Sequence, residues 1–188
     1  MDCLEIFKFY ICSEGAGATV IAVRFEQIIP EEFREGLIRL YLLTESRKIA
    51  RDIRHDFQET TKTWNHKVKF EIVTHLAGGT MESGVETSDP IYVLVNDGSK
   101  ASDKPIEPQA PRRALRFHGT YSAKTSPGVI GSKKGGGSGD IIFAKHAERK
   151  EVEARDFEGA IERKWEPLME QRFQEAFDAA AVASGYEI

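Results

Sequence analysis

Cysteine is scarce in this chain of 188 residues. Its two cysteines, Cys3 and Cys12, stand in an apolar, strand-like opening with no CxxC pair and no adjacent histidine. A disulfide framework and a Cys/His zinc site are therefore both unexpected. We expect two reduced, partly buried thiols in a protein synthesised in the cytoplasm.

Long hydrophobic runs and an excess of positive charge are also missing. No stretch approaches the ~18 apolar residues of a membrane span, and Glu5 and Lys8 interrupt the apolar N-terminus, which argues against a signal peptide. A net charge of −4 argues against a protein that wraps nucleic acid. The length suffices for one domain with a core, and we expect a single domain over residues 1–188 with no membrane partner.

The motifs of common catalytic sites are absent too. The glycine-rich run 131–139 lacks the Gly-Lys-Ser/Thr ending of a phosphate-binding loop, because Lys133 and Lys134 precede the glycines. His146, with Glu148 and Glu151 nearby, supplies one histidine where a zinc protease helix needs two. No Gly-x-Ser-x-Gly elbow occurs. We therefore expect no catalytic centre, no metal and no cofactor.

Hydrophobic periodicity predicts an α+β fold. An antiparallel sheet should pack on one long helix and a C-terminal helix, with long extended loops between them. The first strands, 4–12 and 19–28, should form a hairpin across the turn-like run 13–17. Further strands are predicted at 64–77, 84–87, 114–118 and 141–144, the long helix at 30–59, and the C-terminal helix at 157–183 with Asp156 as N-cap and a kink or break at Pro167.

The long helix should supply much of the core. Ile49, Ile53 and Phe57 recur at helical spacing on one face, so we predict that they pack on the sheet. Arginines lie off this stripe, at Arg34, Arg39, Arg47, Arg51 and Arg54. Carboxylates are interleaved with them, which is typical of a solvated or subunit-contacting face rather than one that binds nucleic acid.

A long polar region follows a short apolar run. Ile91–Val95 leads into the turn Asn96-Asp97-Gly98, and four of the seven prolines then fall within residues 99–140. Loops of this length in a compact domain are functional or disordered. We expect extended arms at 99–113 and 122–140 that are mobile in the isolated subunit and contact neighbouring subunits, because their composition buries little apolar surface.

Three segments resemble the tail-completion, or neck, proteins of long-tailed bacteriophages. The first is 23–28, Val-Arg-Phe-Glu-Gln-Ile, directly before a long helix. The second is 88–100, an aromatic and apolar segment that ends in a turn like the family's Gly-Thr-Lys. The third runs from 142–146, a strand ending in a histidine, to 153–157 (Glu-Ala-Arg-Asp-Phe) and the last helix. The chain departs from the family in having His146-Ala147-Glu148 where His-Pro-Gly is common, and in the long insertion 122–140.

The resemblance implies a structural virion protein without catalysis, located at the head–tail junction. It implies a homo-oligomeric ring, expected to be a hexamer, around the DNA channel, with portal-side connector and tail-terminator or tail-tube proteins as neighbours and DNA nearby. Ile91–Val95 would then be buried at the sheet edge. The implied interface residues are Tyr92, Asn96, Gly98, Lys100, Lys133, Lys134, His146 and Arg155.

Two other classes of protein stay open at this point. One is a small cytoplasmic α+β enzyme or ligand-binding domain whose glycine-rich loop closes over a substrate. The other is a toxin-like or nuclease-like protein that contacts DNA, although the net negative charge of the chain fits DNA binding poorly.

Overall fold

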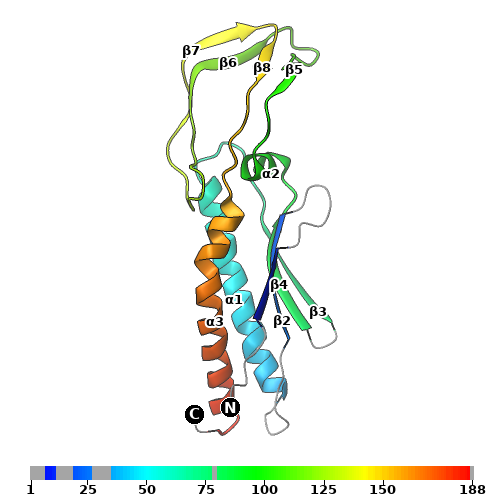
Figure 1. The fold of residues 1–188 in the computed structure, drawn as a ribbon, viewed down its shortest axis with the longest axis vertical. Coiled ribbons are helices and arrows are strands. Elements are labelled where there is room, and N and C mark those ends of the chain that lie inside the picture. Colours follow the sequence, from blue (N-terminus) through cyan, green and yellow to red (C-terminus); the bar gives the residue numbers. More distant parts are fainter. Residues whose placement is uncertain (1–6, 12–18, 27–34, 78–79, 187–188) are drawn as a thin grey trace.

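The structure is a computed structural model, and it describes residues 7–11, 19–26, 35–77 and 80–186. Two long helices and a sheet form an elongated body, from one end of which strands project as an arm (Figure 1). The start predicted for the first helix, at residues 30–34, lies outside the described residues. Within them the α+β class is confirmed, with an antiparallel sheet beside two helices.

The body combines two helices of 27 residues with a four-stranded sheet. Helices α1 (Glu35–Thr61) and α3 (Phe157–Ala183) lie side by side and run in opposite directions, and the sheet lies beside them (Figure 1). The sheet order is β1-β2-β4-β3, and all its pairs are antiparallel. The strands are β1 (Phe7–Ile11), β2 (Thr19–Glu26), β3 (Glu71–Ala77) and β4 (Thr80–Thr87).

The stripe predicted for α1 is in the core. Ile49, Ile53 and Phe57 expose only 2%, 2% and 1% of their surface, which confirms that prediction. They belong to one buried cluster that joins α1 to α3 and to Met81 and Val85 of the sheet. Both helices therefore owe their stability to a shared apolar face.

An aromatic group closes the core where the body meets the arm. Tyr92 is fully buried, and its ring lies 5.1 Å from that of Phe70, 5.7 Å from that of Phe157 and 6.1 Å from that of Phe57. Phe57 is on α1 and Phe157 begins α3, so this one ring contacts both helices. Aromatic pairs at such distances add to the stability gained from burial alone.

The segment around Tyr92 corrects a prediction. Residues 91–95 form part of helix α2 (Pro90–Asp97) and do not lie buried at the sheet edge, since Ile91 and Leu94 are each 46% exposed. Asp89 caps this helix, with Oδ1 accepting hydrogen bonds of 3.0 Å from the amides of Ile91 and Tyr92. An N-cap aspartate followed by proline at the first helical position is the helix signal in the sequence.

The negative charge of the Asp89 carboxylate strengthens this N-cap. Burial raises the pKa of the Asp89 carboxyl, but hydrogen bonds from His66 and from the amides of Tyr92 and Ile91 outweigh this effect and hold the pKa below its ordinary value. Asp89 is therefore ionised at neutral pH, and its negative charge lies at the positive end of the α2 dipole.

Two further predictions need adjustment. The strand expected at 64–77 begins only at Glu71, because residues 62–70 form a turn and an irregular segment. Helix α3 has the predicted bounds and continues through Pro167 without a break. Asp156 precedes it, but its side chain makes no capping hydrogen bond and binds Arg163 at 3.1 Å instead.

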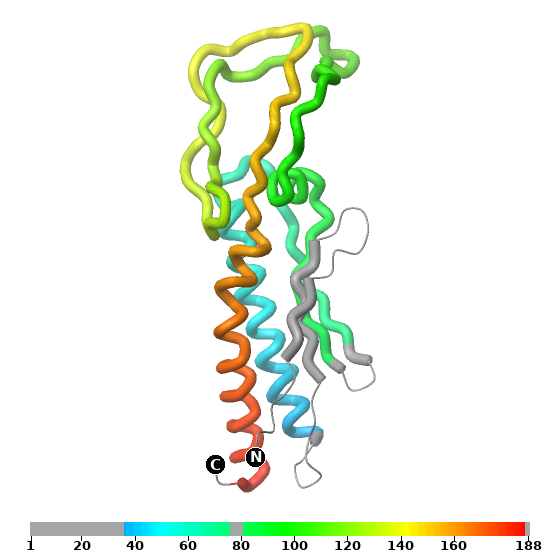
Figure 2. The backbone as a smooth tube through the Cα atoms, viewed as in Figure 1, coloured from blue at the N-terminus to red at the C-terminus, as the bar shows by residue number. Residues whose placement is uncertain are grey.

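The arm consists of two antiparallel ribbons of two strands each. One pairs β5 (Ser102–Ile106) with β8 (Ala147–Arg149), and the other pairs β6 (Leu115–Ser122) with β7 (Gly136–Ala144). Figure 2 shows how the chain leaves α2, passes through both ribbons and returns to the start of α3. The last four residues of the glycine-rich run 131–139 therefore lie within strand β7.

The position of Ile53 yields a stability prediction. We expect Ile53→Asp to lower the free energy of unfolding by about 3 kcal/mol or more, because it removes a buried side chain and buries an unpaired charge. Leu40→Asp, at an exposed apolar site near the start of the same helix, is the matched control and should change it by less than about 0.5 kcal/mol. Urea denaturation measures both, and equal stability of the two variants would contradict the core assignment.

Candidate functional site

Apolar side chains are exposed along the arm, defined here as residues 99–152. On the ribbon of β6 and β7, Tyr121 and Phe143 expose 75% and 68% of their surface. Phe117, Ile141 and Ile142 are also exposed. A protein that is complete as a single chain has little reason to expose so many large apolar groups together.

These side chains occupy both faces of the ribbon. Phe143 pairs with Arg116 across the ladder and Ile141 with His118, so these four share one face. Phe117 pairs with Ile142 on the opposite face. Since neither face is covered by a second layer, an apolar group on either side remains in contact with solvent.

The ribbon also has unpaired edges. Among the described residues, β6 pairs only with β7, and β5 only with β8. Isolated two-stranded ribbons are marginally stable in water, and exposed strand edges are ready to pair with another chain. The arm is therefore the part of the described structure that a bound partner would stabilise most.

The root of the arm is a close backbone crossing. Ser99 and Val152 exchange backbone hydrogen bonds of 2.8 and 2.9 Å, which brings the two ends of the arm together. Gly98 makes this approach possible: a Cβ atom there would lie 2.6 Å from the carbonyl oxygen of Val152. Its φ of +74° and ψ of −178° are also open essentially to glycine alone.

Asn96 connects α2 to the first turn of α3. Its Oδ1 accepts hydrogen bonds from the amide of Phe157 at 2.9 Å and from that of Glu158 at 3.4 Å. Its Nδ2 donates to Glu158 at 2.9 Å, and its backbone carbonyl accepts from the amides of Arg155 and Asp156. Asn96 therefore performs the capping role that sequence reasoning gave to Asp156.

The loop between β6 and β7 returns to the body. Thr63, just beyond α1, donates from its amide to Ser132 Oγ and from its hydroxyl to the carbonyl of Lys133. Lys124 donates to the carbonyl of Thr63 at 2.7 Å, and Ser132 to that of Glu59 at 3.0 Å. These bonds join the loop to the end of α1, while the mobility expected for residues 122–140 in solution stays a prediction.

The eight implied interface residues separate into three groups. Tyr92 and Asn96 are buried inside the subunit, where neither side chain can reach a neighbour, and this corrects their assignment. Gly98 and Arg155 belong to the root, where the Arg155 amide binds the carbonyls of Val95 and Asn96. Lys100, Lys133, Lys134 and His146 are exposed on the arm and can meet a partner.

Sequence reasoning did not identify the apolar positions Tyr121, Ile141 and Phe143 as candidate contacts. A signal was present, because Ile141, Ile142 and Phe143 are three consecutive apolar residues beside a glycine-rich run. In a strand, consecutive residues point to opposite faces, so such a run must be apolar on both.

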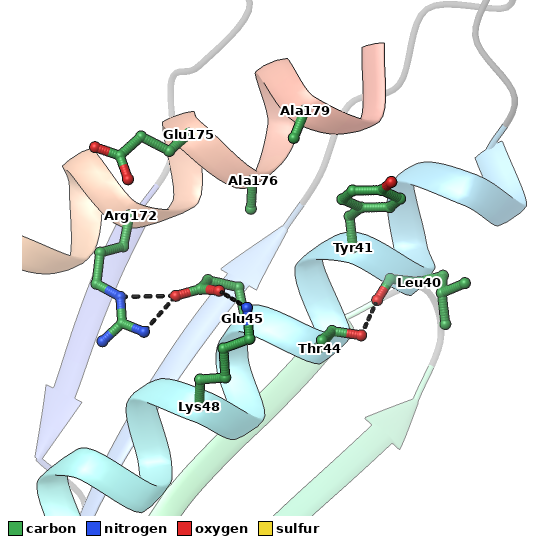
Figure 3. A pocket seen from close by; sticks show the side chains of 9 residues that line it. All are labelled: Leu40, Tyr41, Thr44, Glu45, Lys48, Arg172, Glu175, Ala176 and Ala179. Carbon is green, nitrogen blue, oxygen red and sulfur yellow. Dashed lines mark hydrogen bonds and ion pairs between the residues drawn. The ribbon is translucent and has the colours of Figure 1, made fainter. Parts of the chain in front are cut away.

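A groove of about 430 Å³ between α1 and α3 is a second place where a ligand could bind. Figure 3 shows Arg172 reaching from α3 to Glu45 of α1. Burial raises the pKa of the Glu45 carboxyl, but Lys48 and Arg172 outweigh it and lower the pKa below its ordinary value. Arg172 also binds Asp52 at 2.8 Å, so these charges brace one helix against the other.

Within its described residues the chain has neither a metal-binding cluster nor a helix suited to a membrane. These residues gather no group of three or more His, Cys, Asp or Glu side chains that could hold a metal ion. None of the helices that they form combines the length and the apolar character needed to cross a bilayer. Comparison of the chain with protein-family models, curated sequences and solved structures finds no match.

The contacts of Asn96 yield a second prediction. We expect Asn96→Ala to lower the free energy of unfolding by about 1–3 kcal/mol, because it removes the α3 cap and leaves buried amides without an acceptor. Asn65→Ala, at an exposed asparagine, is the control and should change it by less than about 0.5 kcal/mol. Thermal unfolding would contradict the capping role if the two variants melted together.

Proposed function

We propose that this chain is a structural protein of a tailed bacteriophage, which forms a homo-oligomeric ring around the DNA channel at the head–tail junction. Each copy contributes its body to the wall of the ring and extends its arm to another molecule. Connector and tail proteins are the further neighbours of this ring.

The exposed arm is the observation that carries the proposal. It presents large apolar side chains on both faces of a ribbon with unpaired edges, while the body has a buried core of its own. That combination suits a subunit that folds alone and completes its surface on assembly. The order of strand, long helix, sheet, arm and C-terminal helix also fits the resemblance to neck proteins.

A ligand-binding role for the glycine-rich run has less support. Gly136–Gly139 are paired or bulged residues of β7 opposite β6, and not a loop ahead of a helix, where backbone amides would cradle a phosphate. The groove between α1 and α3 has its charged groups committed to one another. Neither place presents converging polar groups without partners.

Particles of the phage that carries this gene provide the test. We expect the triple variant Tyr121→Ser, Ile141→Ser, Phe143→Ser to fold, because these side chains lie outside the core. Heads and tails should then accumulate unjoined, with infectious titre reduced at least about a hundredfold, and electron microscopy counts joined and separate particles.

The matched control is Leu40→Ser, which changes an exposed apolar residue near the start of α1 and should leave titre unchanged. Absence of the wild-type protein from purified virions would contradict the proposal. So would normal numbers of joined particles from the triple variant.

A further inference from the structure

The charge of the chain is divided between the arm and the body. Residues 99–152 contain eleven Lys and Arg against five Asp and Glu, a net charge of +6. The whole chain has 26 basic and 30 acidic residues, which leaves 15 and 25 outside the arm, a net charge of −10. The modest total of −4 therefore hides two strongly and oppositely charged parts.

The exposed basic side chains of the arm form no ion pair within the described structure. Ten of the eleven are exposed, and among the described residues none of these ten forms an ion pair. Some cations of the body differ, since Lys48, Lys164 and Arg172 each bind a carboxylate. The ten are Lys100, Lys104, Arg112, Arg113, Arg116, Lys133, Lys134, Lys145, Arg149 and Lys150.

Helix α3 has the complementary feature. Glu162, Glu166 and Glu170 recur every four residues, so they form one stripe along the helix. None of the three makes an ion pair or a side-chain hydrogen bond within the described structure. The nearest cations on the helix are committed elsewhere, Arg163 to Asp156 and Lys164 to Asp56. Three like charges at this spacing destabilise a helix unless a cation arrives from outside.

We propose that the arm of one copy packs along α3 of a second copy, where its cations pair with Glu162, Glu166 and Glu170. The proposal rests on the homo-oligomer proposed above, and it names the surface that receives the arm. Figures 1 and 2 show the two ribbons of the arm projecting beyond the end of the body while α3 runs the other way, so these ribbons do not lie along their own helix.

Among the exposed cations of the arm, Arg116 lies within β6, and Arg112 and Arg113 precede that strand in the chain. Arg116 shares its ribbon face with Phe143 and Ile141, so one face offers both charge and apolar area. Because arm and stripe are different surfaces of the same chain, the contact repeats from copy to copy and can close a ring.

DNA is the other acidic partner that a basic arm could meet. Phosphates would neutralise its cations, but they would leave Phe143 and Ile141 uncovered and the stripe on α3 without a partner. A second copy satisfies all three features at once, and the structure therefore favours it.

Charge reversal tests the contact on the purified full chain. One variant makes the arm acidic (Arg112→Glu, Arg113→Glu, Arg116→Glu), and the other makes the stripe basic (Glu162→Arg, Glu166→Arg, Glu170→Arg). Sedimentation velocity should show self-association weakened at least about tenfold in each variant alone. An equimolar mixture should regain association near that of the wild type, because each arm then finds an oppositely charged stripe, and high salt should weaken it.

The control reverses three exposed body cations, Arg47→Glu, Arg51→Glu and Lys67→Glu, and should associate like the wild type. A wild-type chain that stays monomeric at about 200 μM, or a mixture that stays dissociated, would overturn the proposal. So would an arm variant that loses binding to a labelled DNA duplex while its self-association is unchanged. Association of purified protein does not depend on location in a virion, so failure of this contact is distinguishable from failure of the proposed function.

Discussion

The junction of α2 with the first turn of α3 is the constraint on which the rest of the structure depends. Both ends of the arm leave the body here, and Asn96 fixes their separation by binding the amides of Phe157 and Glu158. One helical turn before Asn96, the Tyr92 ring packs against Phe57 of α1 and Phe157 of α3. The same short helix therefore seals the core and carries the arm.

This arrangement separates folding from assembly. The body buries the large apolar side chains of α1, α3 and β4 in one cluster and braces the helices with Arg172. The arm buries little and keeps its apolar groups and cations exposed. Changes on the arm should consequently alter association far more than stability, whereas changes at Ile53 or Asn96 should do the reverse.

The sequence predicted those features that depend on local periodicity. The stripe of α1 and the bounds of α3 follow from apolar residues at helical spacing, and the first hairpin from alternation around a glycine turn. Burial at the sheet edge was the wrong prediction for residues 91–95, because five consecutive apolar residues suit a strand or a helix equally. Asp89 and Pro90 are the residues that favour the helix. The length of β7 was underestimated because glycine has little strand propensity, and pairing with β6 decides its structure.

The candidate site was harder to predict than the fold. The sequence alone indicates that Tyr92 and Asn96 are contact residues before a loop, whereas the tertiary structure buries both side chains. The opposite charges of arm and α3 are visible in the sequence only after the bounds of the arm are known, since the total charge conceals them. Within the described structure, Glu166 and Glu170 are unpaired because Arg163 binds Asp156 and Lys164 binds Asp56. The local sequence pattern does not specify these two ion pairs.

Photo-crosslinking from Phe143 is the measurement that decides most about this protein. A benzoylphenylalanine placed at position 143 in a mixture of ¹⁵N-labelled and unlabelled chains distinguishes contacts between copies from contacts within one copy. We predict crosslinked peptides of mixed isotope that join the arm to residues 157–183 of another chain. Crosslinks only within chains of one isotope, or crosslinks between copies that consistently avoid α3, would contradict the assembly described here.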